Sequence, residues 1–468
     1  LNNILLKSYL RCKRKAWLDY KGDKRYKSWS AQSSIQLINQ HKNFNLISNG
    51  NLFSGIKACE RGYKGVIGLK INQKLKDDLD AVVYPPLLIK KGGVSKWGLY
   101  KYIPVVSKLG HKTTREHFYE LALCLILLEN FEGVRINYGL VVSTFKNKLN
   151  SEKIIINKKL KDKTINIYSE MVKSLKGNIP KITEDRKKCS ICPWQNFCDK
   201  EAKLKSYLTD IDGIGKKTAS ILKNIGISNF KQLASSNKQL INKKLSKFNQ
   251  DNFERTAKLV DQSKSYSSGL PIKIKKYKDL SDIIFKKKSG FFVFDIESDP
   301  DNKHDFFYCF ISIKRDRNRE YFNNYEPILN LKNNQNTKHI KKIFKKLFSE
   351  NDWPVLHYGE TEKIAIVKLA EQASLKSYEI DALKSRFIDL HILMRETWIL
   401  PIKNYSLKTV ANWTGFKWHN KNASGSKALF WWIQYNETLN ESFLQKIIEY
   451  NKDDCLATLN IANWLILN

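Results

Sequence analysis

The sequence predicts an α/β protein built from more than one domain. With 468 residues the chain exceeds the usual size of a single hydrophobic core, so two or three domains are expected. Between residues 286 and 468, short apolar runs alternate with stretches of helical periodicity, which is typical of a layered α/β sheet. Hydrophobic residues make up 42% of the chain and supply enough apolar surface for packed cores.

The chain is strongly basic, with 82 Lys and Arg residues against 46 Asp and Glu residues and a formal net charge of +36. Such an excess predicts a polyanionic partner, because neutralising phosphates releases condensed counterions. An AT-rich coding sequence, which favours Lys and Asn codons, is an alternative source of part of the excess. Nucleic acid, and DNA in particular, is the expected partner.

No run of about 18 uncharged apolar residues occurs, and the first residues lack the apolar core of a signal peptide. We therefore expect a cytoplasmic protein without a membrane partner. Because the chain starts at Leu1 rather than Met, we expect an initiating residue to precede it.

Residues 1–20 have the periodicity of a helix that carries Cys12. Much later, Cys189, Cys192 and Cys198 form a C-x2-C-x5-C group. Three thiolates at this spacing can hold one soft metal centre, and Cys12 is the best candidate for a fourth ligand. The remaining cysteines have no such spacing and are expected to be small core residues: Cys59, Cys124, Cys309 and Cys455.

A distant N-terminal cysteine combined with C-x2-C-x5-C resembles the iron–sulfur staple of RecB-like nucleases. The resemblance implies a restriction-endonuclease-type α/β domain over residues 1–205, closed by a [4Fe–4S] cluster on the four cysteines Cys12, Cys189, Cys192 and Cys198. Zn²⁺ is the chemical alternative, since tetrahedral four-thiolate sites accept it as well.

RecB-like nucleases carry a PD-(D/E)xK core, in which two acids bind Mg²⁺ and a lysine positions the attacking water. The corresponding stretch here runs from Tyr84 to Lys108 and continues into a helix that starts near Glu116. Lys108 matches the lysine of the motif. The first acid falls on or near Pro86, which cannot bind a cation as a carboxylate would.

The second acid of that motif falls on Val106 or Ser107, and Glu120 stands where the family has a Gln. One of three upstream acids could replace the first acid, but no acid stands beside Lys108. Those three are Asp77, Asp78 and Asp80. We therefore expect a degenerate nuclease domain that binds DNA without hydrolysing it.

Residues 206–262 contain the string Gly213-Ile-Gly215-Lys216-Lys217 between helical patterns. Glycines at this spacing allow a tight turn whose backbone N–H groups face a phosphate, and the lysines add positive charge. The string resembles the helix-hairpin-helix module, which implies non-specific binding of a DNA backbone through Gly213, Gly215, Lys216 and Lys217. A plain glycine turn in a solvated basic patch is the alternative. Residues 263–285, rich in Ser and Lys, suit a linker.

The apolar run 291–294 predicts a buried strand, on which the following Asp295 and Glu297 share one face because strand side chains repeat every two residues. Two adjacent carboxylates repel each other unless a hard cation such as Mg²⁺ or Mn²⁺ lies between them. The stretch therefore predicts half of a metal site. Strands are also expected over 306–313 and 319–322, followed by a helix over 337–349.

Two further motifs follow in order: His357-Tyr-x3-Glu362 and, on a terminal helix, Tyr450-x3-Asp454. The series over residues 286–468 resembles the DEDDy exonucleases of the ribonuclease H-like fold. The resemblance implies a 3′–5′ exonuclease in which Asp295, Glu297, Glu362 and Asp454 bind two Mg²⁺ or Mn²⁺ ions and Tyr450 orients the attacking water. The whole chain resembles RecB-like nucleases fused to such an exonuclease.

Several acids near these motifs leave alternatives open. Glu360 could replace Glu362, and Asp389 could be an extra ligand or a residue at a strand end capped by an amide. We expect the other nearby acids to be solvated: Asp299, Asp301 and Asp453.

Four tryptophans are expected in the core or an interface, with base stacking as the alternative: Trp413, Trp418, Trp431 and Trp432. For the whole protein, RNA is an alternative substrate, and a non-catalytic scaffold for nucleic acid is the alternative function.

Overall fold

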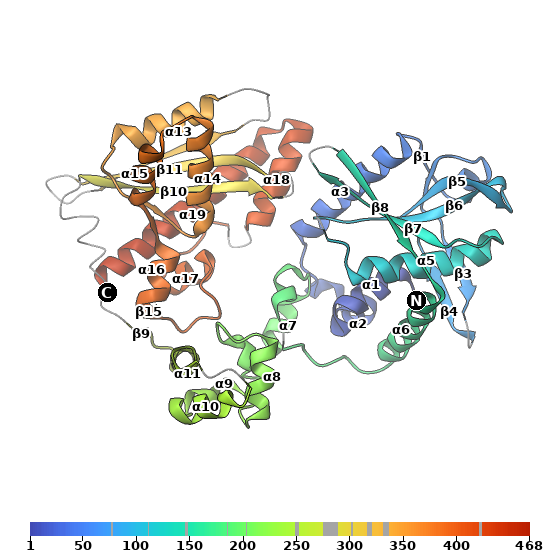
Figure 1. The fold of residues 1–468 in the computed structure, drawn as a ribbon, viewed down its shortest axis with the longest axis horizontal. Helices are drawn as coiled ribbons and strands as arrows, with labels where there is room; N and C mark the ends of the chain where they lie inside the picture. Colours follow the sequence, from blue (N-terminus) through green and yellow to red (C-terminus); the bar gives the residue numbers. More distant parts are fainter. Residues whose placement is uncertain are drawn as a thin grey trace. The chain divides into compact units, whose positions relative to one another are not determined.

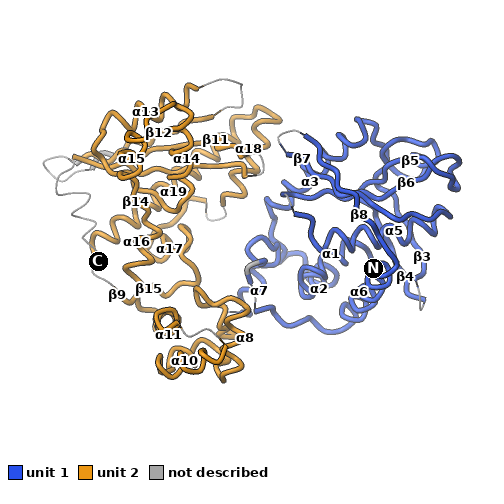
Figure 2. The backbone as a smooth tube through the Cα atoms, in the orientation of Figure 1, with its two compact units in different colours: residues 1–202 blue, residues 203–468 orange. Residues whose placement is uncertain are grey.

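The structure is a computed structural model that describes residues 1–75, 78–110, 112–145, 148–184, 186–202, 204–248, 252–274, 289–300, 303–315, 321–330, 337–420 and 424–468. The chain forms two compact units, residues 1–202 and residues 203–468 (Figure 2). Both are mixed α/β, and no helix among the described residues is both long and apolar enough to cross a membrane.

The first unit contains a six-stranded sheet of order β1-β2-β5-β6-β7-β8. Its pairs β1–β2 and β6–β7 are parallel, and the others are antiparallel. The strands are β1 (Leu52–Ser54), β2 (Gly65–Ile67), β5 (Leu87–Ser95), β6 (Gly98–Ser107), β7 (Tyr138–Phe145) and β8 (Lys148–Ile155). A separate antiparallel hairpin consists of β3 (Ile71–Lys74) and β4 (Asp80–Val83).

Helix α5 (Arg115–Glu132) lies at the centre of this unit, because residues all around it are buried. It packs on β6 and β7 and also on the helices α1 and α6. The other helices of the unit are α1 (Asn3–Arg11), α2 (Lys13–Lys21), α3 (Ala31–Ser48), α4 (Ile56–Glu60), α6 (Lys158–Lys176) and α7 (Gln195–Ala202), with short 3₁₀ turns η1 (Lys24–Tyr26) and η3 (Lys187–Ile191). The single helix expected over 1–20 is broken at Cys12, whose extended backbone separates α1 from α2.

The second unit begins with a small helical module: η4 (Leu208–Asp210), α8 (Lys216–Asn224), α9 (Phe230–Ala234), α10 (Lys238–Ser246) and α11 (Phe253–Ser268). Helix α11 continues to Ser268, so the first six residues of the expected linker are helical. Their serines suggested a solvated linker, yet Ser263 and Ser265 are buried and their hydroxyls donate to the carbonyls of Leu259 and Leu270. Residues 275–285 of the expected linker lie outside the described residues.

A five-stranded sheet of order β12-β11-β10-β13-β14 follows in the same unit (Figure 1). Its strands are β10 (Gly290–Asp299), β11 (His304–Arg315), β12 (Tyr321–Leu329), β13 (Val355–His357) and β14 (Phe387–Asp389). Strands β10, β13 and β14 run parallel, and β11 and β12 are antiparallel to their neighbours. Part of the strand expected over 319–322 lies outside the described residues.

Helices cover both faces of this sheet. Side chains alternate along β10, so neighbouring residues pack in the hydrophobic cores on opposite faces. Phe292 and Phe294 pack with α13 (Lys338–Ser349), α14 (Glu360–Gln372) and α15 (Ser377–Arg386). Phe291 and Val293 pack on the other face. The helices on that face are α16 (Leu390–Thr397), α17 (Leu407–Trp413), α18 (Gly425–Thr438) and α19 (Glu441–Leu467).

The helical module is joined to the sheet domain within this unit. A short antiparallel pair connects β9 (Ile272–Lys273), which follows α11, with β15 (Trp398–Ile399), which follows α16. The Gln262 side chain of α11 donates to the carbonyl of Leu400 over 2.7 Å. Two ion pairs add to the contact, Arg395 with Asp212 at 2.9 Å and Lys403 with Asp210 at 2.7 Å.

Candidate active site

Asp295 and Glu297 lie on the face of β10 that is covered by α19. They continue the alternation of Phe291 and Val293, which belong to the core on that face. The register between β10 and β11 shifts immediately after Glu297, so the regular pairing ends beside the two acids. Both carboxylates are buried.

Helix α19 brings Asp454 to the same place. One oxygen from each of Asp295, Glu297 and Asp454 lies within 4.8 Å of the others. Tyr450 is four residues before Asp454, hence on the same face of the helix, and the two side chains share a hydrogen bond. The amide of Asn451 donates to Oδ2 of Asp295 over 2.7 Å. The structure thus brings together four of the five residues that the sequence predicted for this site.

The electrostatics of this group are unfavourable without a cation. Burial, followed by the nearby Cys309 thiol and the other carboxylates, raises the pKa of Asp295 well above its usual value. The pKa of Glu297 is also raised, by burial and by Asp454. Burial raises the pKa of Asp454 to about 6, although hydrogen bonds from Trp418 and Tyr450 oppose this effect. Within the described part of the chain, none of the three carboxylates forms an ion pair with Lys, Arg or His.

Oxygen-only donors in a buried, anionic group are the ligands that Mg²⁺ and Mn²⁺ prefer, so the residues fit a hard divalent cation. Glu362, at the start of α14, is the fourth predicted ligand. It is buried, its field contributes to the raised pKa values of Asp295 and Glu297, and its Oε2 has no hydrogen-bond partner among the described residues. It lies outside the group of three whose oxygens are within 4.8 Å. Glu360 is exposed, which favours Glu362 of the two alternatives.

Of the two alternatives for Asp389, the structure favours a residue at a strand end whose carboxylate accepts from backbone amides. Its Oδ1 accepts from the backbone N–H groups of Gly359, His391 and Ile392 at 3.1, 2.8 and 3.3 Å, and so begins α16.

The expectation that Asp299 and Asp453 are solvated was wrong, because both are buried. Asp453 accepts two hydrogen bonds from His419, one from the backbone and one from the ring. Those donors come from a segment 34 residues away, so the sequence around Asp453 could not reveal them. Asp301 lies outside the described residues.

Sequence reasoning missed two residues that contact the site. Asn451, beside Tyr450, contacts Asp295, and Trp418 donates its indole N–H to Oδ1 of Asp454 over 2.7 Å. No sequence signal distinguished Trp418 from the other tryptophans, which are buried or packed against the same core as expected. Cys309 and Cys455 are fully buried, as expected, but their sulfurs are 2.8 Å apart and adjoin Asp295.

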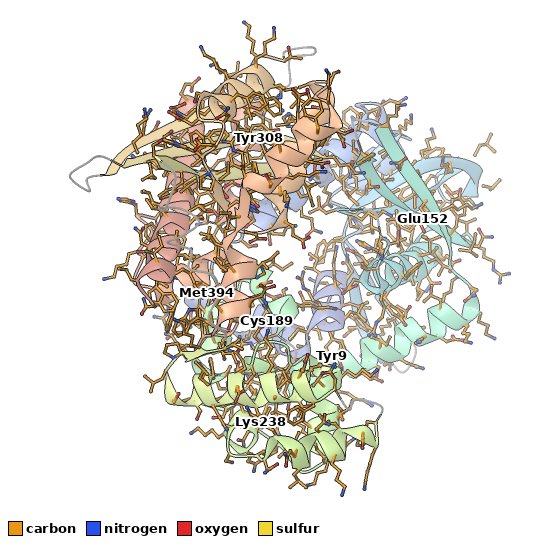
Figure 3. The ribbon with its side chains drawn as sticks, turned by 60° about the vertical axis from the view of Figure 1, so that its left-hand side comes forward. Tyr9, Glu152, Cys189, Lys238, Tyr308 and Met394 are labelled. Carbon is orange, nitrogen blue, oxygen red and sulfur yellow. The ribbon has the colours of Figure 1, made fainter. Side chains whose placement is uncertain are left out.

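The second candidate site, in the first unit, contains the four cysteines (Cys189 is labelled in Figure 3). Electrostatic effects connect Cys12 with Cys189 and Cys192, and Cys192 with Cys198, so the thiols lie in one neighbourhood. All are half-buried. Basic side chains surround them: Arg11, Arg14, Lys15 and Arg186.

The segment that carries three of these cysteines is fixed to the N-terminal helices. The indole N–H of the buried Trp194 donates to Asp19 over 2.9 Å, and Arg14 donates to the carbonyl of Pro180 over 2.9 Å. Zn²⁺ would draw its sulfur ligands to within about 3.8 Å of one another. Among the described cysteines, no three sulfurs of this group lie within 4.8 Å of each other.

The stretch that corresponds to the PD-(D/E)xK core contains paired polar groups. Lys108 follows β6 and donates to Thr113 over 2.9 Å. Its ammonium also lies 3.3 Å from Glu152 of β8 (labelled in Figure 3), so the expectation that no acid adjoins Lys108 was wrong in three dimensions. The long β7–β8 hairpin, not the local sequence, supplies this acid. Lys7 neutralises Glu120 at 3.0 Å.

Three other polar positions of that core are described by the structure. The hydroxyl of Ser107 accepts from Asn43 over 2.8 Å. Asp78 and Asp80 are exposed on the separate β3–β4 hairpin, and Asp77 lies outside the described residues.

The Gly213–Gly215 turn connects η4 with α8. Gly213 has a φ of +84°, which favours glycine, and Gly215 caps the N-terminus of α8. Lys216 and Lys217 are exposed. The first helical element is a single 3₁₀ turn, shorter than the expected helix.

Comparison with protein families shows that residues 292–466 match the family model RNase_H_2 of the RNase H superfamily. The C-terminal domain is therefore RNase H-like, and this superfamily generally hydrolyses phosphodiester bonds. The match supports a nuclease-type domain and, with it, nucleic acid as the partner. No curated protein matches the chain.

Proposed function

We propose that the protein is a metal-dependent 3′–5′ exonuclease that hydrolyses DNA, or RNA, in its C-terminal domain. The observation that supports this most strongly is the convergence of Asp295, Glu297 and Asp454 in a buried group that has no ion pair to a basic side chain among the described residues. Such a group is electrostatically unfavourable by itself and becomes favourable with divalent cations.

Asp295, Glu297, Asp454 and Glu362 would hold the ions. When bound there, two divalent ions would activate a water molecule and stabilise the leaving 3′-oxygen. Tyr450, through its hydrogen bond with Asp454, would place its hydroxyl beside the attacking water. Asn451 holds one oxygen of Asp295 and leaves the other for ligation.

The remaining parts of the chain would bind the polymer. We propose that the Gly213–Gly215 turn binds a phosphate of the backbone, with the exposed Lys216 and Lys217 adding positive charge. The first unit would be a degenerate nuclease domain that binds DNA, since Glu120 and Glu152 beside its motif region are paired with lysines. The four cysteines would hold a [4Fe–4S] cluster whose negative charge suits the surrounding Arg and Lys side chains.

End-labelled single-stranded and duplex DNA and RNA, incubated with the full-length protein and Mn²⁺ or Mg²⁺, test the proposal. Stepwise shortening from the 3′ end is expected, and it should stop with chelator and in Asp295→Ala. Tight binding without cleavage under either metal would contradict the enzyme and favour a non-catalytic scaffold. Hydrolysis that persists in Asp295→Ala and stops in Lys108→Ala would place the chemistry in the first unit.

For the cysteine site, a brown protein with broad visible absorption after anaerobic purification is expected. Cys192→Ala should lose this absorption and the iron. Colourless protein that contains one equivalent of zinc would contradict the iron–sulfur assignment.

A further inference from the structure

The segment before α18 is attached to the candidate active site at two neighbouring points. Trp418 donates its indole N–H to Oδ1 of Asp454 over 2.7 Å. The next residue, His419, donates its backbone N–H to Oδ2 of Asp453 over 2.8 Å, and its ring Nδ1 lies 2.6 Å from Oδ1 of the same carboxylate. Consecutive residues of the segment thus bind consecutive carboxylates of α19.

This arrangement restricts both partners. Successive residues of an α-helix point about 100° apart around its axis, so two attachments to adjacent positions fix the segment along the helix and around it. The Trp418 ring is further held by Phe416, edge-on at 4.9 Å, and by Lys408, whose Nζ lies 5.6 Å from the ring centroid. The indole is 4% exposed and cannot swing away from Asp454 without leaving the core.

The contact matters for Asp454 because a carboxylate can rotate about its terminal bond, which has a broad torsional preference. An indole N–H can only donate, and an ionised carboxylate can only accept, so the direction of this hydrogen bond is fixed. Hydrogen bonds to a charged acceptor are about twice as strong as neutral ones. Bound to Trp418, Asp454 keeps one orientation toward Asp295 and Glu297.

We propose that Trp418 is a positioning residue that holds Asp454 in the orientation in which it ligates a divalent cation, and that the contact between His419 and Asp453 anchors Trp418 in place. The inference rests on the proposed function, since it takes Asp454 as a metal ligand. Trp418 acts through Asp454 and does not itself touch the metal or the substrate.

Trp418→Phe tests the proposal, because it removes the N–H group and keeps an aromatic ring in the core. Trp432→Phe is the matched control: Trp432 is 1% exposed, stacks on Phe306 at 4.6 Å, and its indole N–H has no hydrogen-bond partner among the described residues. Two properties of the full-length protein are measured: kcat and KM on end-labelled single-stranded DNA, and Mn²⁺ affinity without substrate by electron paramagnetic resonance.

For Trp418→Phe we expect kcat to fall about 10- to 100-fold and Mn²⁺ binding to weaken by about tenfold, as for other residues that orient a metal ligand, with KM for DNA unchanged. Trp432→Phe should match the wild type. Wild-type kcat and Mn²⁺ affinity in Trp418→Phe would overturn the proposal. Equal losses in both variants would also overturn it, because they would show a packing effect.

His419→Ala is a second variant, chosen because the side chain is 86% exposed and its loss leaves the core intact. The backbone bond to Asp453 remains, so kcat should fall by only about 3-fold, roughly the value of one hydrogen bond. No change in kcat or Mn²⁺ affinity would overturn the anchoring role.

Failure of the proposed function gives a different pattern. If the wild type binds Mn²⁺ but hydrolyses nothing, the exonuclease proposal fails, whereas weaker Mn²⁺ binding in Trp418→Phe alone would still support the positioning role. If the wild type binds no Mn²⁺, the positioning role is overturned as well.

Discussion

Both units of the chain hold acidic side chains at candidate sites in an α/β fold, but the two sets of acids have different partners. In the first unit, Glu120 lies 3.0 Å from Lys7, and Glu152 lies 3.3 Å from Lys108. In the second unit, Asp295, Glu297 and Asp454 face one another, and among the described residues no basic side chain forms an ion pair with them. The charge of Lys408 acts on Asp454 alone and lowers its pKa only in part. A carboxylate neutralised by the protein has little need of a metal, whereas three crowded carboxylates do.

The comparison shows that the partners of a motif residue matter as well as the residue itself. Lys108 is present where a PD-(D/E)xK nuclease requires a lysine, yet its ammonium is occupied by Glu152 and Thr113. The partner of an acidic or basic group, more than its presence, indicates whether a site can bind a cation.

The largest expected effect tests this contrast directly. Asp295→Asn removes one charge from the unpaired group and should lower metal-dependent hydrolysis by more than about 100-fold, the upper end for residues that only support a ligand. Lys108→Ala should leave hydrolysis unchanged. Rates on end-labelled DNA measure both, and a larger loss in Lys108→Ala would reverse the roles of the two units.

Glu132, in the first unit, differs from Glu120 and Glu152 because its hydrogen-bond donors are uncharged. It is buried, and its oxygens accept from the neutral N–H groups of Tyr102 and Trp97 at 3.2 and 3.1 Å. Burial raises the pKa of Glu132 to about 7. Between about pH 4.5 and 7 the folded state therefore holds a proton that the unfolded state has lost, and stability falls as the pH rises through this window.

The free energy of unfolding should fall by roughly 3 kcal/mol by pH 8. Glu132→Gln should remove most of this pH dependence. Urea unfolding of wild type and variant at pH 5 and pH 8 measures it. Identical pH dependence in the two proteins would show that Glu132 is ionised in the folded state throughout.

Lys7→Met removes the ion pair between Lys7 and Glu120 in the first unit. Glu120, which is 4% exposed, would lose its cation, and the free energy of unfolding should fall by about 2 kcal/mol, less than for a fully buried pair because Lys7 is partly exposed. Glu120→Gln should cost less, since it leaves no buried charge. Urea unfolding compares them, and a greater cost for Glu120→Gln would mean that Lys7 contributes little to the pairing.

The smallest effect has the opposite sign. In chelator, Glu297→Gln should stabilise the protein by about 1 kcal/mol, or roughly 2–4 °C in Tm, because it relieves repulsion among the buried carboxylates. The variant should also lose the rise in Tm that Mn²⁺ gives the wild type. A lower Tm in chelator would show that repulsion at Glu297 is not significant.

Much of the second unit could be predicted from the sequence. The alternation after Phe294 places Asp295 and Glu297 on one face, and the four-residue spacing places Tyr450 beside Asp454. These features depend only on the periods of strands and helices. The break at Cys12 and the burial of Ser265 depend on tertiary contacts, so local composition was misleading there.

The partners of the acids could not be predicted for the same reason. Glu152 reaches Lys108 through a hairpin, and Trp418 reaches Asp454 across 36 residues. Neither pair has a periodic signature. Asp453 was misassigned because its donors lie on a loop, where sequence carries little information about contacts.

The junction between the helical module and the sheet domain bears on how this chain could be divided. A cut near residue 286, where the sequence suggests a boundary, would separate β9 from β15 and take Gln262 from the carbonyl of Leu400. The cut would also remove two ion pairs, those of Lys403 with Asp210 and of Arg395 with Asp212, which lie next to the Gly213 turn. The module and the RNase H-like domain are therefore one piece for recombination or transplantation. A chimera that exchanges the RNase H-like domain alone would lose the partners of β15, of the Leu400 carbonyl and of two basic side chains.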